Sequence, residues 1–175
     1  MTIKRLLALL TAVMLLFTVP AALAQQAPVA FDVAAYISSV SGLDLAPFRG
    51  RTVMLHFFTA GGAECQAQLP ILKMLRDDFD AAGLEIVLIH VQDGETAQDA
   101  EAALAACGLE GVTVYEDENC ALSSLLGVTA YPNTLILGKD GSPASGYGGL
   151  ISYPTLAAAL EMLNVRRLGN SYQAD

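Results

Sequence analysis

The stretch from Arg51 to Pro70, RTVMLHFFTAGGAECQAQLP, constrains the fold more than any other part of the chain. It begins with an apolar run, residues 52–58, that is rich in β-branched and aromatic side chains, which predicts a strand buried on both faces. After a break at residues 59–62, apolar side chains recur at helical spacing, at Leu69, Leu72, Leu75 and Phe79. The sequence therefore predicts a buried strand, a glycine turn and a helix that has Cys65 in its first turn.

This unit resembles the start of a thioredoxin-fold domain, most closely the periplasmic TlpA/ResA-like branch. In that branch a strand leads into W-C-x-x-C and then into K/R-x-E-x-P on the helix. Laid over the pattern without gaps, the chain has Gly61 at the tryptophan position, Gly62 at the first cysteine position and Cys65 at the second. Gln68 takes the glutamate position and Pro70 that of the helix proline. The resemblance implies the family scaffold with much of its chemistry changed.

A second segment carries the same resemblance. The run GVTAYPNT, residues 127–134, is similar to the loop G-V-x-x-x-P-T, which supplies a cis-proline opposite the active-site cysteines in this superfamily. A cis bond before Pro132 would turn the backbone of Tyr131 outward, so that a substrate strand could pair with it. The alternative is an ordinary turn proline before an edge strand. We expect Tyr131 and Pro132 to form a partner-binding surface together with Gly61 and Gly62.

Strands alternate with helices along the chain, which predicts an α/β fold. The resemblance specifies a thioredoxin-like three-layer sandwich, a central mixed sheet with helices on both faces. Beyond the first strand, we expect strands at 85–91, 112–115 and 134–137 and helices at 63–82, 97–107, 117–126 and 152–163. Residues 31–45 are expected to form a hairpin or a short helix plus strand, and residues 146–149 a flexible hairpin return.

The first 24 residues have the pattern of a cleavable secretory signal peptide. Lys4 and Arg5 precede an apolar run, and Ala22-Leu23-Ala24 forms a small-x-small cleavage site. The apolar run is about 14 residues, shorter than the roughly 20 that a membrane span needs, although retention as an anchor is the alternative. We expect a thioredoxin-like domain at 25–165, a loose polar tail at 166–175, and a periplasmic or secreted location, where thiols tend to be oxidised.

The residues at the helix start argue against ordinary dithiol exchange. A dithiol oxidoreductase needs an exposed sulfur at the helix N-terminus and a second sulfur one turn later. Gly62 has no side chain, so no C-x-x-C disulfide can form there. The amide of Gln68 cannot shuttle protons at neutral pH, and the chain contains no tryptophan. The sequence therefore predicts a degenerate site that binds a peptide or protein partner without dithiol–disulfide exchange.

Cys65 has two interpretations. The favoured one is a buried, inert thiol, because free cysteine is among the most buried residue types and the neighbouring Glu64 disfavours a thiolate. The alternative is an enzyme that uses Cys65 as a single catalytic cysteine. Peroxiredoxins resemble this fold with T-x-x-C in place of C-x-x-C, but Thr59 is too far upstream to match.

Cys107 and Cys120 bring the cysteine count to three, an odd number. They are expected at opposite ends of a strand, where they would be poor disulfide partners. Cys120 and Cys65 both follow strands, at the sheet edge where sites gather in α/β folds. A Cys65–Cys120 bridge or relay is therefore a second enzymatic alternative, with Cys120 as the second thiol of a thiol oxidoreductase.

Other classes of function are disfavoured by composition and spacing. His56 and His90 lie inside apolar strands and are expected to be core residues, and no ligand spacing indicates a metal site or another cofactor. The net charge of −9 argues against nucleic acid and anionic lipid head groups as partners. The acid clusters at 77–80 and 116–118 are expected on solvated faces. The expected partner is a peptide or protein of the cell envelope, with membrane contact only if the leader is retained.

Overall fold

The computed structural model describes residues 31–168. The expected leader at 1–24 and residues 169–175 of the expected tail lie outside this range. The elements in chain order are α2 (Val33–Ser41), the 3₁₀ turn η2 (Ala46–Phe48), β1 (Thr52–Phe58), α3 (Ala63–Asp78), β2 (Leu84–Val91), α4 (Ala97–Ala106), β3 (Thr113–Asp117), the 3₁₀ turn η3 (Glu118–Cys120), α5 (Ala121–Leu125), β4 (Asn133–Leu137), β5 (Pro143–Gly148) and α6 (Tyr153–Met162). Within this range no helix is long and apolar enough to cross a membrane.

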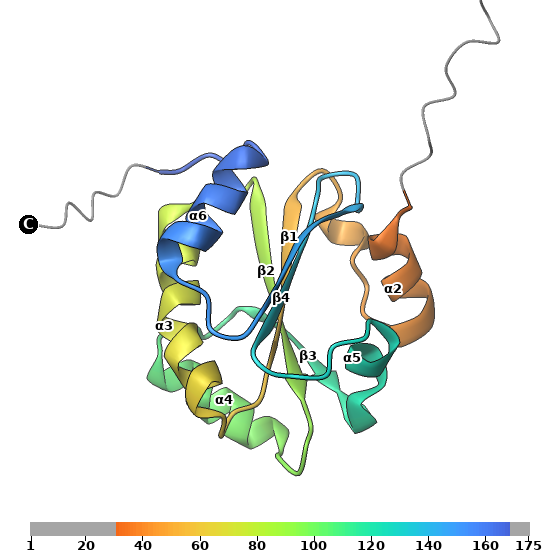
Figure 1. The fold of residues 1–175 in the computed structure, drawn as a ribbon, viewed down its shortest axis with the longest axis vertical. Coiled ribbons are helices and arrows are strands. Elements are labelled where there is room, and N and C mark those ends of the chain that lie inside the picture. Colours follow the sequence, from red (N-terminus) through yellow and green to blue (C-terminus); the bar gives the residue numbers. More distant parts are fainter. Residues whose placement is uncertain (1–30, 169–175) are drawn as a thin grey trace, which may run out of the picture. The chain divides into compact units, whose positions relative to one another are not determined.

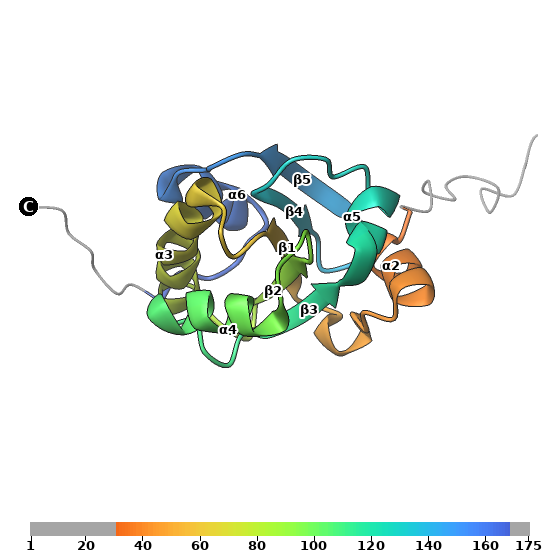
Figure 2. The same ribbon diagram turned by 90° about the horizontal axis from the view of Figure 1, so that it is seen from below.

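The strands form one mixed sheet in the order β3-β2-β1-β4-β5 (Figures 1 and 2). β1, β2 and β3 run parallel to one another, so their carboxyl ends meet at the same end of the sheet. β4 lies antiparallel to β1, and β5 antiparallel to β4. The start of β4 therefore lies beside the carboxyl end of β1, where α3 also begins.

Helices cover both faces of this sheet, as the sequence predicts. α3, α4 and α6 lie on one face, and α2 and α5 lie on the other (Figure 1). Every residue of β1 is buried because its side chains alternate between the two layers. Met54 and Phe58 pack into the cluster under α3, whereas Leu55 and Phe57 pack into the cluster under α2. The predicted three-layer α/β sandwich is confirmed.

The end of α3 differs from the prediction. The helix ends at Asp78, four residues early, because Phe79 turns to extended backbone and forms a β-bridge with Arg167. The Leu168 N–H donates to the carbonyl of Asp78 at 2.7 Å, and the Asp80 N–H donates to the carbonyl of Arg166 at 2.9 Å. Residues 166–168 are thus bound to the domain, and the expectation of a loose tail is wrong for these three.

Two other segments also depart from expectation. Residues 33–41 form the short helix of one alternative, α2, with Asp32 accepting the Ala35 N–H at 2.8 Å as its cap, but neither the hairpin nor the strand expected after the helix is formed within residues 31–45. Residues 143–148 form β5, an edge strand, where the glycines at 146–149 indicated a flexible return. Glycine lowers strand propensity, so this strand depends largely on its backbone pairing with β4 and on the packing of Tyr147 against the core.

Each of the two acid clusters contains a buried carboxylate. Asp117 is fully buried and accepts the N–H groups of Leu122 and Ser123 at 2.7 and 2.9 Å, which caps α5. Asp78 is 3% exposed and accepts hydrogen bonds from the Tyr153 hydroxyl and from Arg167. The prediction of solvated faces is wrong for these two residues. Their hydrogen bonds offset the cost of burying a carboxylate, so both can lie inside the domain.

Candidate functional site

The site expected from the sequence lies where β1 ends and α3 begins. Gly62 is the N-cap of α3, with φ −69° and ψ 122°, which are ordinary values for any L-residue. A Cβ atom built on Gly62 would lie 3.4 Å from the Cβ of Cys65 and 3.2 Å from its Sγ. Disulfide partners have Cβ atoms about 3.5–4.5 Å apart. Positions 62 and 65 therefore have nearly the spacing of a C-x-x-C pair, from which one sulfur is missing.

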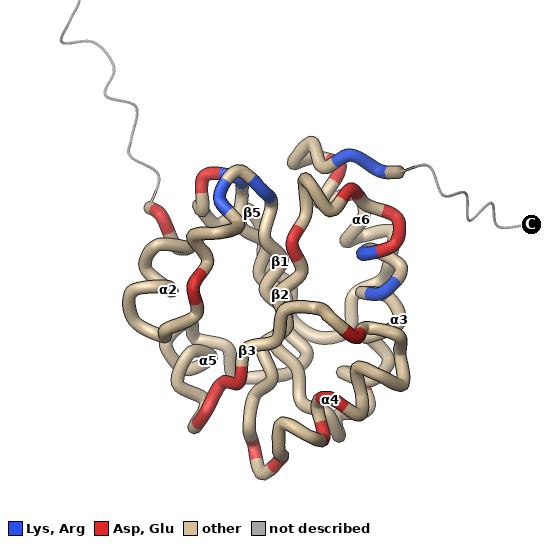
Figure 3. The backbone as a smooth tube through the Cα atoms, turned by 180° about the vertical axis from the view of Figure 1, so that it is seen from behind, with Lys and Arg blue, Asp and Glu red and all other residues tan. Residues whose placement is uncertain are grey.

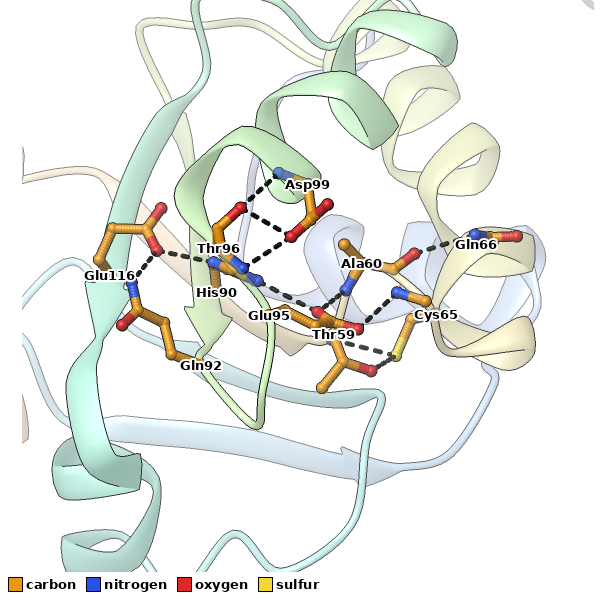
Figure 4. Close-up of polar contacts among 11 residues, drawn as sticks. Thr59, Ala60, Cys65, Gln66, His90, Gln92, Glu95, Thr96, Asp99 and Glu116 are labelled. Atoms are coloured by element: carbon orange, nitrogen blue, oxygen red, sulfur yellow. Dashed lines mark hydrogen bonds and ion pairs between the residues drawn. The ribbon is translucent and has the colours of Figure 1, made fainter.

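The remaining sulfur is closed off from solvent. Cys65 is 1% exposed and belongs to the cluster under α3. The backbone N–H of Thr59 lies 3.5 Å from Sγ and the Thr59 hydroxyl 3.7 Å from it (Figure 4). The thiol is thus covered by the loop that precedes the helix, which agrees with the interpretation of a buried thiol.

The other two cysteines lie apart from this thiol. All three are free in the structure. Cys65 packs on the face covered by α3, whereas Cys120 packs against the cluster on the opposite face, so the sheet separates them. Cys107 ends α4, at the other end of β3 from Cys120. The Cys65–Cys120 bridge, given above as an enzymatic alternative, is therefore not formed in the structure: both residues follow strands, but they lie on opposite faces of the sheet.

Tyr131 and Pro132 lie beside the end of β1, because Asn133, the next residue, pairs with Phe57. The bond between Tyr131 and Pro132 is cis, as the resemblance to the family's proline loop implies. The Pro132 carbonyl accepts the Gly149 N–H at 2.8 Å. Tyr131 donates from its hydroxyl to Ser123 Oγ at 3.4 Å, and partial burial raises the pKa of this phenol despite that hydrogen bond.

The backbone just before the proline is available for pairing. Within residues 31–168, the N–H and C=O groups of Ala130 and Tyr131 have no hydrogen-bond partner. Ala130 is exposed and Tyr131 is half-buried. Because solvent can reach unpaired backbone groups at such a position, an extended chain could pair with them.

Gln68, at the family's glutamate position, has a structural role. Its side chain is fully buried. Oε1 accepts the Ile151 N–H at 2.7 Å, and Nε2 donates to the Ile151 carbonyl at 3.1 Å. This pair of bonds joins α3 to the connection between β5 and α6. A carboxylate could accept from Ile151 but could not donate, so the amide is the side chain that satisfies both groups.

A carboxylate that the sequence analysis missed occupies the loop before α3. Glu95, in the connection from β2 to α4, accepts the backbone N–H groups of Ala60 and Gly61, the latter at 2.7 Å (Figure 4). A Cβ atom built on Gly61 would lie 3.0 Å from Glu95 Oε1, closer than almost all real contacts. The glycine at the family's tryptophan position thus makes room for this carboxylate.

His90 holds Glu95 from the other side. The ring is fully buried at the end of β2. Its Nε2 lies 3.2 Å from a Glu95 oxygen, and its Nδ1 lies 2.6 Å from Glu116 Oε2 (Figure 4). Gln92 donates to the same Glu116 oxygen at 3.0 Å. We call the connected set Glu95, His90 and Glu116 the Glu95 bridge, because it joins the loop before α3 to β2 and β3.

Electrostatics favour an ionised Glu95. Partial burial raises the pKa of its carboxyl group, but the amide hydrogen bonds from Gly61 and Ala60 and the contact with His90 outweigh this, so the pKa lies below its usual range. The carboxylate also lies near the N-terminus of α3, where the helix dipole favours negative charge. One signal for Glu95 was present in the sequence, since it follows β2 at the edge where β1 also ends.

A shallow groove of about 450 Å³ borders this loop, lined by Ala60, Gly61, Gln66, Glu95, Asp99, Ala102 and Ala103. The groove lies on the α4 side of the loop and includes neither Tyr131 nor Pro132. In the described part of the chain, no group of three His, Cys, Asp or Glu side chains could hold a metal ion. The polar side chains that line the groove are those of Gln66, Glu95 and Asp99.

Solved structures with the same fold are numerous. The crystal structure of StoA from Bacillus subtilis has a TM-score of 0.56 and 20% identity, covering 65% of this chain and 84% of that one. A putative thiol:disulfide interchange protein DsbE from Chlorobium tepidum has a TM-score of 0.62 and 21% identity, covering 68% and 84%. A secreted Mycobacterium tuberculosis disulfide oxidoreductase homologous to E. coli DsbE has 0.59 and 17%, covering 67% and 85%.

These identities are low, so the structural matches show a shared fold. No curated protein sequence matches this chain significantly. A family model described as thioredoxin-like matches residues 50–142, which is more than half of the chain and extends from the start of β1 to the turn after β4. The chain therefore belongs to the thioredoxin-like family.

Proposed function

We propose that this protein is a thioredoxin-like domain protein of the cell envelope that binds an extended peptide or protein partner and does not exchange dithiols. The partner would lie across Tyr131 and Pro132 and the glycines at 61 and 62. A periplasmic or secreted location, after cleavage of residues 1–24, is part of the same proposal and rests on the pattern of the leader.

The observation that carries the proposal is the state of the loop before α3. The position for an exposed sulfur is Gly62, and Cys65 is 1% exposed. The amides of Ala60 and Gly61, which lead into the helix start, already donate to the Glu95 carboxylate. A mixed disulfide with a substrate needs an accessible sulfur, and this loop offers none.

Partner binding is supported by the free backbone groups of Ala130 and Tyr131. Peptide recognition by strand addition uses main-chain hydrogen bonds for affinity and side-chain contacts for specificity. These groups lie next to β4, and because Gly62 has no side chain, nothing projects from position 62 to obstruct a bound chain. A bound strand could thus lie across both segments.

The enzymatic alternative, a thiol oxidoreductase or peroxidase that uses Cys65 alone or with Cys120, gains no support from the geometry. Cys65 is covered by Thr59, and Cys120 packs on the opposite face of the sheet. A reaction at Cys65 would require the loop 59–62 to open and release its hydrogen bonds to Glu95.

Thiol counting tests the chemical half of the proposal. The protein is alkylated under native conditions and again after unfolding, and the modified cysteines are mapped by mass spectrometry. We expect slow labelling of Cys65 in the native protein, fast labelling after unfolding, and no catalysis of insulin reduction by dithiothreitol. Fast native labelling of Cys65, or a bridge between Cys65 and Cys120, would make the protein an enzyme candidate and refute the proposal.

A further inference from the structure

The positive charges of the described domain lie away from the candidate site. They are Arg49, Arg51, Lys73, Arg76, Lys139, Arg166 and Arg167. Three of them flank the amino end of β1 and the far end of β4, two lie in the second half of α3, and two follow α6. Lys73 is ten residues along α3 from Ala63, or about 15 Å at the rise of an α-helix. In Figure 3 the Lys and Arg segments all lie in the upper half of the domain.

Acidic residues alone occur where the parallel strands end. We call this set the acidic end; it consists of Glu64, Asp93, Glu95, Asp99, Glu116, Asp117 and Glu118. They come from the first turn of α3, the connection from β2 to α4, the first turn of α4, and the end of β3 with the turn after it. The acidic residues of β3 and α4 lie in the lower part of Figure 3.

The charges at the opposite end are largely neutralised. Ion pairs there join Arg49 to Asp32, Arg51 to Glu85, Lys73 to Asp77, Arg166 to Asp80 and Arg167 to Asp78. Each Lys or Arg in these pairs thus has an acidic partner nearby. The domain's excess of negative charge is consequently not spread evenly over its surface.

The acidic end has little compensation of its own. Glu95 and Glu116 share the single ring of His90. Asp99 and Asp117 are used as helix caps. The remaining three, Glu64, Asp93 and Glu118, are exposed, and none of them forms an ion pair within residues 31–168.

The uncompensated carboxylates belong to segments that border the proposed partner-binding surface. Glu64 lies two residues after Gly62 in the first turn of α3, and Asp93 lies in the same connection as Glu95, which contacts Gly61. Glu118 belongs to the turn that also contains Cys120, a neighbour of the Tyr131 phenol. A segment bound at Tyr131 and Gly61 would therefore lie near segments that carry uncompensated carboxylates.

From this distribution we propose that the partner is an extended segment rich in lysine or arginine. The proposal rests on the proposed function, because it names the chemical class of partner for the same surface. Strand pairing with Ala130 and Tyr131 would supply affinity that is independent of sequence, and the acidic end would select cationic side chains and accelerate association. A second copy of this chain fits less well, because two acidic ends would then face each other.

Three probe peptides test the inference. They are blocked ten-residue peptides in which alanine alternates with lysine, with glutamine or with glutamate, titrated into the ¹⁵N-labelled protein and followed by NMR. We expect the lysine peptide to shift the amides of Gly61, Gly62, Ala130 and Tyr131. Its affinity should fall as NaCl is raised from about 0.05 to 0.3 M, since the Debye length shortens over that range.

A pair of charge-reversal variants locates the effect. Glu64→Lys/Asp93→Lys changes the acidic end, and Glu110→Lys/Glu161→Lys makes the same change of net charge at exposed positions elsewhere. Both variants are first shown to be folded by circular dichroism. Replacing two attractions by two repulsions should weaken binding of the lysine peptide by about tenfold, against less than about twofold for the control variant.

The outcomes separate the two proposals. If the glutamine and glutamate peptides bind at Ala130 and Tyr131 as tightly as the lysine peptide, the charge inference is overturned and the partner-binding function stands. If the two variants weaken binding equally, net charge and not the acidic end is responsible, and the inference is again overturned. If no peptide shifts these amides, the proposed function fails with it.

Discussion

The substitution Gly62→Cys would restore the C-x-x-C pair, and the structure allows its consequences to be worked out. The backbone at Gly62 suits an L-residue, and the new Cβ would lie 3.4 Å from the Cβ of Cys65. The obstacle is Thr59, whose Oγ1 would lie only 2.7 Å from the new Cβ. This hydroxyl is the end of a short side chain that can change rotamer, so the loop does not have to move.

The expected energies are small. Displacing the Thr59 hydroxyl from its position beside Cys65 costs about 1 kcal/mol. Cysteine has fewer unfolded conformations than glycine, which raises the free energy of unfolding by about 0.4–1 kcal/mol. The reduced variant should therefore be nearly as stable as the original protein. Oxidation closes a loop of four residues, which stabilises the folded state by about 2 kcal/mol at most.

Three measurements check this sequence of effects. Alkylation in oxidising buffer should find only Cys107 and Cys120 as free thiols in the folded variant. Urea unfolding with and without dithiothreitol should differ by about 2 kcal/mol. The variant should also catalyse insulin reduction, whereas the control Gly62→Ala should not.

A companion variant makes the test decisive. Gly62→Cys/Thr59→Ala removes the hydroxyl that the new Cβ would contact, so the bridge should form at least as readily in this background. If both variants keep four free thiols under oxidising conditions, Gly62 does not stand at the first cysteine position and the structural reasoning is refuted.

Three further predictions concern other residues. Glu95→Gln should lower the free energy of unfolding at pH 7 by about 1–3 kcal/mol, as judged by urea titration. Because the folded-state pKa of Glu95 lies below its usual 4.5, this difference should vanish as the pH falls well below 4.5. A difference that persists in acid would contradict the role of the charge. Burial lowers the pKa of His56 to about 3 from its ordinary 6.5, so the unfolded chain binds a proton at a higher pH than the folded protein does. The free energy of unfolding should therefore fall by up to about 1.4 kcal/mol per pH unit as the pH is lowered from 6.5 to 3. His56→Leu should reduce this slope, and an unchanged slope would rule out His56 as its source. Gln68→Glu should destabilise the fold by about 1–3 kcal/mol in urea titrations at pH 7, because the Ile151 carbonyl loses its hydrogen-bond donor. An unchanged midpoint of urea unfolding would show that the hydrogen bond from Gln68 to this carbonyl contributes nothing to stability.

The sequence predicted most of the fold because its strongest signals are local. β1 was evident from a mostly apolar run of seven residues, and the start of α4 from Thr96 and Asp99, which form the capping box seen in the structure. The errors arose where distant contacts decide. The end of α3 is set by pairing between Phe79 and Arg167, 88 residues apart in the chain, and β5 is a strand because β4 lies beside it.

The site was predicted in part for the same reason. The relation of Gly62 to Cys65 is fixed by helical spacing, so it could be deduced from four consecutive positions. The Glu95 bridge could not, because it joins residues from the ends of three strands. His90 looked like a core residue and is buried, but its two ring nitrogens contact carboxylates from different segments. Spacing along one chain segment contains no information about such a contact.

The close approach of Gly61 to Glu95 has a consequence for reading related sequences. Because a side chain at position 61 would crowd the carboxylate oxygen, the two positions should vary together among relatives. Where a bulky residue stands at the position of Gly61, we expect the position of Glu95 to lose its acid; where the glycine is kept, the acid should be kept with it. Members of the family that share this arrangement could then be distinguished by two letters of their alignment, even when their cysteines differ.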